Sequence, residues 1–332
     1  MDFIQSQQSF FNHIKSKLSP HLSMVDEIAG LLNISNDSAY RRIRGEKPIG
    51  LDEIQKLCRH YKISLDQLLQ LDSDTVIFST NLKDQGNSSL NKYLEGILAN
   101  LVHIKSLPDS QFYCFNKDIP MFYFMQFTEL AAFKFFFWKR TIMNYPELSR
   151  QQFKGEENDN DIVEKGKKII KTYIEIPSTE ILNEEIVLVT LKQIEFYREA
   201  RLFENKHILL KVYGQLEELV NHMEIQAEQG LKFLYNEKAS ALSATNNIYI
   251  NEYLLGTNSI YVQAGNRQLT ILNHAGINFM STQDKNFCDY TFNNLQNIIR
   301  KSTHISVIGE KERSMFFNSI REKIYEQKKN IL

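Results

Sequence analysis

The sequence lacks the residue patterns that most catalytic and metal-binding sites require. It has no glycine-rich phosphate loop followed by Lys and Ser or Thr, no dinucleotide-binding fingerprint and no Gly-x-Ser-x-Gly motif. Its eight histidines show no His-x-x-x-His pairing, and no Cys-x-x-Cys motif occurs. We therefore expect a protein that is not an enzyme and that has no catalytic residue, metal site or cofactor.

Cysteine is also scarce, because the chain has only three, all far apart. Neither a disulfide framework nor a metal-ligand spacing can be built from them, which favours a reducing compartment. The first six residues lack the basic segment and apolar run of a signal peptide. The most apolar stretch, residues 119–138, is interrupted by polar and charged side chains: Gln126, Glu129 and Lys134. These absences predict a cytoplasmic protein without a membrane partner.

An excess of charge of one sign is missing as well. The formal net charge is −1 at pH 7, and the first 70 residues carry nine Lys and Arg against eight Asp and Glu. Phosphate contact needs only a local positive patch, however, and not a basic protein. Such a patch lies within seven residues, opposed by Glu46 alone, and consists of Arg41, Arg42, Arg44 and Lys47.

Residues 25–45 contain the pattern of two short helices joined by a tight turn. The first helix is predicted by apolar residues at helical spacing: Val25, Ile28, Ala29 and Leu32. Asn33 follows where the chain must turn, and Asn tolerates the left-handed backbone conformation. Ser35 is a good N-cap for the second helix, which Gly45 ends.

This helix-turn-helix resembles the DNA-binding domain of the phage repressor and Cro-type (XRE) transcriptional regulators. The residues that follow extend the resemblance, because Gly45-Glu46-Lys47-Pro48 leads into two more short apolar patterns. The last of these opens with Ile63-Ser64-Leu65-Asp66 and closes on Leu68 and Leu69. With a first helix at residues 3–18, the resemblance implies a lambda-repressor-like domain of five helices. The chain departs from the family at Asn33, where most members have Gly, and at Arg42, where many have an apolar residue.

The resemblance implies double-stranded DNA as a partner, with the second helix of the pair entering the major groove N-terminus first. Ser35 would cap this helix and contact phosphate, and Arg44 and Lys47 would neutralise backbone phosphates. Arg42 could join either the phosphate-contacting or the base-contacting group. The candidate base-contacting residues are Asn36, Asp37, Tyr40 and Arg41.

The rest of the chain predicts an α+β protein that is mainly helical. We expect a DNA-binding domain at 1–71, a linker at 72–89 with a short strand near 76–78, a helical region at 90–240 and an α+β region at 241–332. Helices are predicted at 90–104, 120–144, 161–175, 184–203, 206–237, 285–301 and 310–328. Short β-type runs predict a small antiparallel meander near the C-terminus (248–250, 260–262, 269–272 and 277–279) and one further strand at 305–308.

Aromatic residues are concentrated between residues 122 and 138, where nine rings occur. Large rings bury much area per side chain, which favours a central core helix. The same composition also suits an apolar pocket for a hydrophobic effector, and the sequence leaves both interpretations open.

The sequence therefore favours a sequence-specific DNA-binding transcriptional regulator of bacterial or phage type. One domain of this size reaches one half-site, so we expect a homodimer. The domain order resembles that of peptide-responsive regulators, which implies a C-terminal region that dimerises and can bind a small-molecule or peptide effector. The alternative is a protein–protein interaction module that uses the helix-turn-helix fold and the aromatic core to bind a partner protein.

Overall fold

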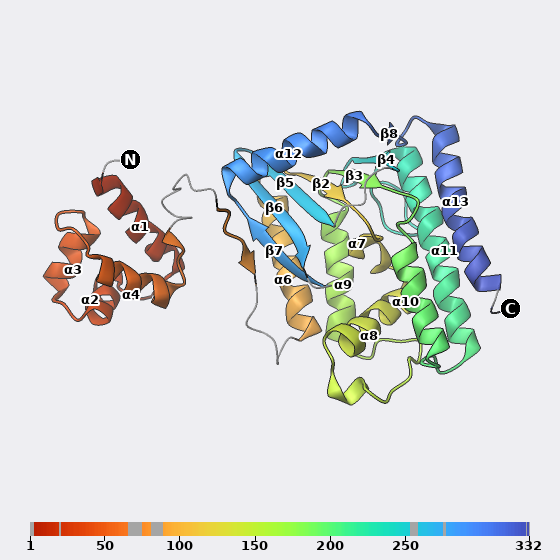
Figure 1. Ribbon diagram of the computed structural model, residues 1–332, viewed down its shortest axis with the longest axis horizontal. Helices are drawn as coiled ribbons and strands as arrows, with labels where there is room; N and C mark the ends of the chain where they lie inside the picture. Colours follow the sequence, from red (N-terminus) through yellow and green to blue (C-terminus); the bar gives the residue numbers. More distant parts are fainter. Residues whose placement is uncertain are drawn as a thin grey trace. The chain divides into compact units, whose positions relative to one another are not determined.

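The computed structural model describes residues 3–19, 21–65, 75–80, 89–252, 258–274, 277–329 and 331 (Figure 1). The chain forms two compact units, Met1–Ile77 and Phe78–Leu332. The regions 90–240 and 241–332, which were predicted as separate regions, both belong to the second unit.

The N-terminal unit is helical in its described part. It contains α1 (Phe3–Lys17), α2 (Met24–Leu32), α3 (Asn36–Ile43) and α4 (Leu51–Tyr61), so the predicted helix-turn-helix is present as α2 and α3. Phe11, Ile14 and Ile28, together with Ala39 from α3 and Leu57 from α4, form its core. From residue 66 onward, the fifth predicted helix lies outside the residues that the structure describes.

The C-terminal unit contains a mixed sheet that is larger than the predicted meander. The described residues form eight strands: β1 (Ser79–Thr80), β2 (Gln111–Phe115), β3 (Ser178–Leu182), β4 (Asn246–Ile250), β5 (Ser259–Ala264), β6 (Arg267–His274), β7 (Asn278–Thr282) and β8 (Thr303–His304). Their order is β1-β7-β6-β5-β2-β3-β4-β8. β2, β3 and β4 are parallel, and all other neighbours are antiparallel. The prediction of a small antiparallel meander was right for β5–β7. It was wrong for the run at 248–250, which belongs to β4 and pairs in parallel with β3, and it did not include the parallel pairing of β2, β3 and β4.

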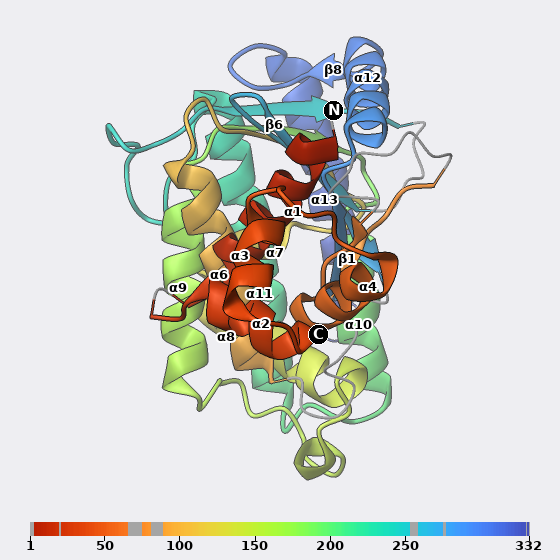
Figure 2. The same ribbon diagram turned by 90° about the vertical axis from the view of Figure 1, so that its left-hand side faces the viewer.

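Helices cover both faces of this sheet. The larger core, on one face, includes residues of α6 (Leu90–Ser106), α7 (Met121–Phe124), α8 (Thr128–Phe137), α9 (Asn160–Tyr173), α10 (Leu188–Glu199), α11 (Lys206–Gln229) and α13 (Glu310–Lys329). The other face packs on α12 (Lys285–Arg300) through Phe115, Ile181, Tyr261, Cys288 and Leu295. Figure 2 agrees with Figure 1 in showing α12 at one end of this unit and α8 at the other.

Several predicted boundaries were wrong for local reasons. The helix expected at 120–144 is broken, because Phe127 takes an extended conformation between α7 and α8 and a π-helical turn, Trp138–Ile142, follows α8. A short 3-10 helix at Pro146–Leu148 comes next. α11 ends at Gln229 and not at 237, because Gly230 adopts a left-handed conformation (φ 65°) that stops the helix. The strands expected at 76–78 and 305–308 lie at 79–80 and 303–304.

Candidate functional site

The turn between α2 and α3 has the geometry that the sequence predicts. Asn33 is left-handed (φ 55°), and the backbone N–H of Ile34 donates to the Ala29 carbonyl at 3.0 Å. Ser35 is the N-cap of α3, with its hydroxyl oxygen 3.3 Å from the backbone nitrogen of Ser38. The N-terminus of α3, which carries the positive end of the helix dipole, is therefore capped and set off from α2 by a tight turn.

Arg42 does not belong to the exposed face of α3, which corrects its place among the candidate DNA contacts. The residue is 7% exposed. Its Nε lies 2.9 Å from Oε2 of Glu53, and its Nη2 lies 2.8 Å from Oε1. Nη1 donates to the carbonyl and the hydroxyl of Ser38, at 3.1 and 2.8 Å. The guanidinium of Arg42 thus holds α3 against α4.

The pairing also affects the Glu53 carboxylate. Partial burial alone would raise the pKa of Glu53, but the hydrogen bonds from Arg42 and from the backbone N–H of Gly50 outweigh it. The pKa of Glu53 consequently lies below its ordinary value of 4.5. The carboxylate stays ionised and paired at neutral pH.

Gln7 is a second buried contact of α3, and it is not among the residues predicted from the sequence. The residue is 4% exposed, and its side-chain amide donates to the carbonyls of Arg42 at 2.7 Å and Lys47 at 2.8 Å. Its Oε1 accepts from the backbone N–H of Ile49 at 3.2 Å. The signal was present in the sequence, because Gln7 lies three and seven residues before Phe10 and Ile14 on the same helical face.

The other candidate residues on α3 and the following loop are exposed. Tyr40 is 48% exposed, and the side chains of Arg41 and Arg44 are 53% and 59% exposed. The positions follow helical spacing, so they share one outward stripe. This stripe, which we call the α3 face, consists of Asn36, Asp37, Tyr40, Arg41 and Arg44, with Lys47 exposed just beyond it.

Several contacts restrain the side chains of the α3 face. Arg41 and Arg44 share the exposed carboxylate of Glu46, at 4.0 and 3.3 Å, and Arg44 also lies over the Tyr40 ring at 5.5 Å. Exposed ion pairs of this kind contribute little and exchange readily for other anions. The Asn36 amide donates to Asp26 on α2 at 2.8 Å, so it must exchange this partner to contact a base.

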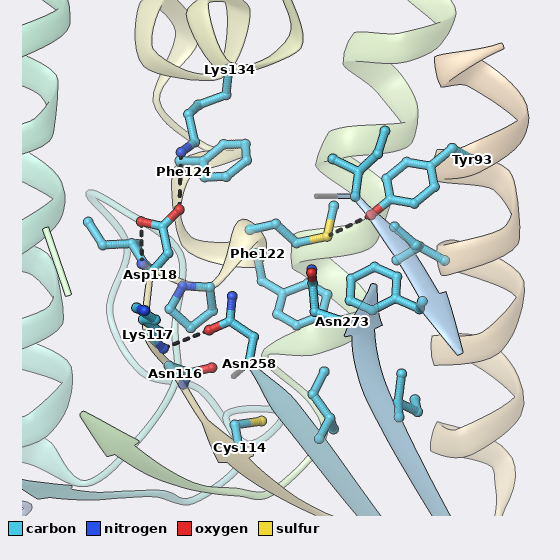
Figure 3. A pocket seen from close by; sticks show the side chains of 18 of the residues that line it. Tyr93, Cys114, Asn116, Lys117, Asp118, Phe122, Phe124, Lys134, Asn258 and Asn273 are labelled. Atoms are coloured by element: carbon cyan, nitrogen blue, oxygen red, sulfur yellow. Dashed lines mark hydrogen bonds and ion pairs between the residues drawn. The ribbon is translucent and has the colours of Figure 1, made fainter. Parts of the chain in front are cut away.

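The C-terminal unit holds a cavity of about 340 Å³ between α6, the segment after β2, α8, α10 and the strands β5–β7 (Figure 3). Much of its lining is apolar: Ile97, Leu101, Phe112, Phe122, Phe124, Trp138, Ile260, Ile271 and Phe279. The aromatic segment contributes to both the core and the cavity, because Phe133 and Phe135 are core while Phe122 and Trp138 also line this cavity.

An ion pair stands at one edge of the cavity. Lys134 is 2% exposed, and its ammonium lies 3.4 Å from Oδ2 of Asp118, 3.0 Å from the Thr190 hydroxyl and 2.9 Å from Oε1 of Gln193. The same ammonium lies 5.4 Å from the centroid of the Phe124 ring. Lys134 and Asp118 are thus held by several partners at the cavity wall.

A buried polar cluster lies on the sheet beside the cavity. Glu180 is fully buried on β3 and accepts hydrogen bonds from the hydroxyls of Tyr123 (3.0 Å), Tyr173 and Ser178 (3.1 Å). Lys232 lies 3.6 Å from the centroid of the Tyr173 ring, and its burial lowers its pKa to about 8 although Glu180 opposes the shift. Helices α7 and α9 are tied to the sheet through these groups.

Other features bear on chemistry and location. Burial raises the pKa of all three cysteine thiols, which keeps them in the weakly nucleophilic protonated form. In the described part of the chain, no group of three or more His, Cys, Asp or Glu residues is placed to hold a metal ion. None of the described helices is long and apolar enough to cross a membrane.

Comparison with known protein families supports the reading of the N-terminal unit. Residues 19–86 match the family model of the BetR domain, a DNA-binding type of helix-turn-helix. The match includes α2, α3 and α4 and supports a role as a DNA-binding regulator in a general sense. No curated protein and no solved structure matches the chain.

Proposed function

We propose that the protein is a sequence-specific DNA-binding transcriptional regulator of bacterial or phage type, related in its N-terminal unit to XRE regulators. The observation that carries the proposal is the α3 face: a capped helix held rigidly by Arg42 and Gln7 that presents polar and cationic side chains outward. The BetR match over the same helices supports it. The proposal assigns no catalytic activity to the chain.

The roles of the residues follow from their positions on α3. Near the N-terminus, Asn36 and Asp37 would approach base edges, where Asn suits adenine and Asp accepts from the cytosine amino group. Arg41, one turn further, suits guanine, and Tyr40 lies beside it. Ser35, Arg44 and Lys47 would contact phosphates, which position the helix without reading sequence. Arg42 has no DNA contact in this proposal.

A regulator of this kind acts as a dimer, because one helix-turn-helix reaches only one half-site. We propose that the C-terminal unit makes the dimer and that its cavity receives an effector. Sedimentation of the full-length protein with a duplex that it binds measures the number of chains per duplex in the complex. Two chains per duplex are expected, and one chain per saturated duplex contradicts the dimer.

Affinity measurements on two variants test the assignment of roles. Arg41→Ala should lower affinity for a selected duplex by about 1–3 kcal/mol, with a much smaller effect on random DNA, because a base contact is lost. Lys47→Ala should weaken binding to both duplexes alike and reduce the salt dependence, because a phosphate contact is lost. If both variants lose equally on selected and random DNA, the assignment of roles is wrong.

A further inference from the structure

The cavity of the C-terminal unit is suited by size and wall chemistry to a small ligand with an apolar body. Its volume of about 340 Å³ is at the low end of ligand pockets, which span roughly 300–1,000 Å³. Ile97 and Leu101 from α6, Ile260 and Ile271 from the sheet and the ring of Phe122 are among the apolar residues that line this space. These walls offer an apolar body only dispersion and burial, so the ligand's orientation must come from the polar residues.

Asn116 provides a polar group without a partner at the cavity wall. It directly follows β2, it is 7% exposed, and its backbone N–H donates to the Ile181 carbonyl at 3.1 Å, which fixes its position. In the described part of the chain, its side-chain Nδ2 is buried and has no hydrogen-bond partner. A buried donor of this kind is stabilised by an acceptor, which a ligand oxygen would supply.

A second weakly satisfied donor lies on the other side. Figure 3 shows Asn116, Lys117 and Asp118 along one wall and Tyr93 on the opposite one. Among the described residues, the hydrogen bond of the Tyr93 hydroxyl goes to the thioether sulfur of Met121, at 3.9 Å. Thioether sulfur is a weak acceptor. Both walls therefore favour a ligand that accepts hydrogen bonds over one that donates them.

The charges at the wall favour an anion. Three charged residues line the cavity, the cations Lys117 and Lys134 and the carboxylate Asp118. Asp118 is already satisfied, because it pairs with Lys134 and accepts from the Thr190 hydroxyl (3.1 Å) and the Ile119 backbone N–H (2.8 Å). One positive charge remains uncompensated within this set of lining residues, that of Lys117, which is exposed to solvent and follows Asn116 in the sequence.

We infer that this cavity binds a small amphipathic monocarboxylate. The hydrocarbon body lies between α6 and the strands β5 and β6, and the carboxylate accepts a hydrogen bond from Asn116 Nδ2, with the exposed Lys117 as the uncompensated cation of the lining. The inference rests on the proposed function in that it names the chemical class of the regulator's effector. Binding itself requires no DNA, so it is tested separately.

Binding at this site can be followed by the intrinsic fluorescence of the protein. Trp138 is the single tryptophan of the sequence, and it lines the cavity. Titration of the full-length protein with octanoate, followed by tryptophan emission, should give a saturable change. Octanamide has the same apolar body without the charge and should bind about tenfold or more weakly, because a charge-assisted hydrogen bond becomes a neutral one.

Three variants locate the site. Asn116→Asp exchanges the unsatisfied amide for a carboxylate and should weaken octanoate binding at least about tenfold, since like charges repel. Ile271→Phe fills the cavity and should abolish binding. Gln126→Glu is the matched control, because Gln126 also has a buried side-chain nitrogen without a described partner but lines a different cavity, between α8 and α9. The affinity of Gln126→Glu for octanoate should equal that of the unaltered protein.

The outcomes are distinct. No saturable emission change up to the solubility limit of octanoate overturns the inference, as does unchanged octanoate binding by folded Asn116→Asp or Ile271→Phe. Equal affinities for octanoate and octanamide overturn the carboxylate assignment. None of these results depends on the α3 face. If the proposed role of the α3 face is wrong, the protein will not discriminate between DNA sequences, and octanoate binding is unaffected by that result.

Discussion

Replacing Arg42 by Met should destabilise the N-terminal unit without removing a DNA contact. Removing one partner of a buried ion pair costs about 3–5 kcal/mol, because the other charge remains desolvated. We expect about 3 kcal/mol, the low end of that range, since the Glu53 side chain is 16% exposed and keeps its bond to the Gly50 N–H. The double variant Arg42→Met/Glu53→Met should recover most of this loss, because neither charge is then buried.

Hydrogen exchange of the full-length protein, followed by mass spectrometry over residues 21–65, measures this effect directly. Trp138 lies in the other unit, so its emission does not report on these helices. Arg41→Met is the matched control: it should leave protection unchanged and lower specific DNA affinity. If Arg42→Met keeps full protection in α3 and α4 yet loses DNA affinity, Arg42 contacts DNA and our account of its role is refuted.

Two further predictions concern pH. Because the pKa of Glu53 is lower in the folded state, its pairing stabilises the N-terminal unit above pH 4.5. This contribution should be lost as the pH falls through the lowered pKa. Hydrogen exchange measured across that pH range should show the loss of protection in the unaltered protein and not in Glu53→Gln. The pKa of Lys232 is lowered to about 8 from 10.5, so the unfolded chain binds more protons between these values. The free energy of unfolding of the C-terminal unit, relative to Lys232→Met, should therefore rise by roughly 3 kcal/mol from pH 8 to 10.5. Denaturant titrations at several pH values measure this difference, and a flat difference contradicts it.

Local signals made the N-terminal unit predictable. Apolar spacing, Asn33 in the turn and Ser35 at the cap each determine structure through neighbouring residues, and the structure places all three as expected. The burial of Arg42 had a signal that was not used. Arg42 lies three residues after the buried Ala39, whereas Arg41 lies about 100° away around the helix.

Strand β3 and the parallel pairing at the centre of the sheet had no comparable signal. β3, with the sequence Ser-Thr-Glu-Ile-Leu, is buried at every position, so it shows no alternation of polar and apolar residues. Its neighbours β2 and β4 lie far away in the chain and are reached through helical crossovers. Glu180 in its middle is stabilised by tyrosines from α7 and α9, which only the folded unit brings together.

The sequence indicated which aromatic residues could line a cavity, but it did not indicate where in the fold the cavity lies. The aromatic concentration at 122–138 indicated either a core or a pocket, and the break at Phe127 gives the chain both. The polar wall depends on Asn116 and Asp118, which follow the end of β2, and on Lys134 from α8. These side chains come together only because of the order of the strands in the sheet, and the sequence pattern did not predict that order.

The central claim, that the α3 face reads DNA as part of a dimer, is tested most directly by selecting bound duplexes from random DNA with the full-length protein at two salt concentrations. The account predicts an enriched palindrome with half-sites about one helical turn apart and binding that weakens steeply with salt. No enriched sequence, together with no salt-sensitive binding, would contradict it.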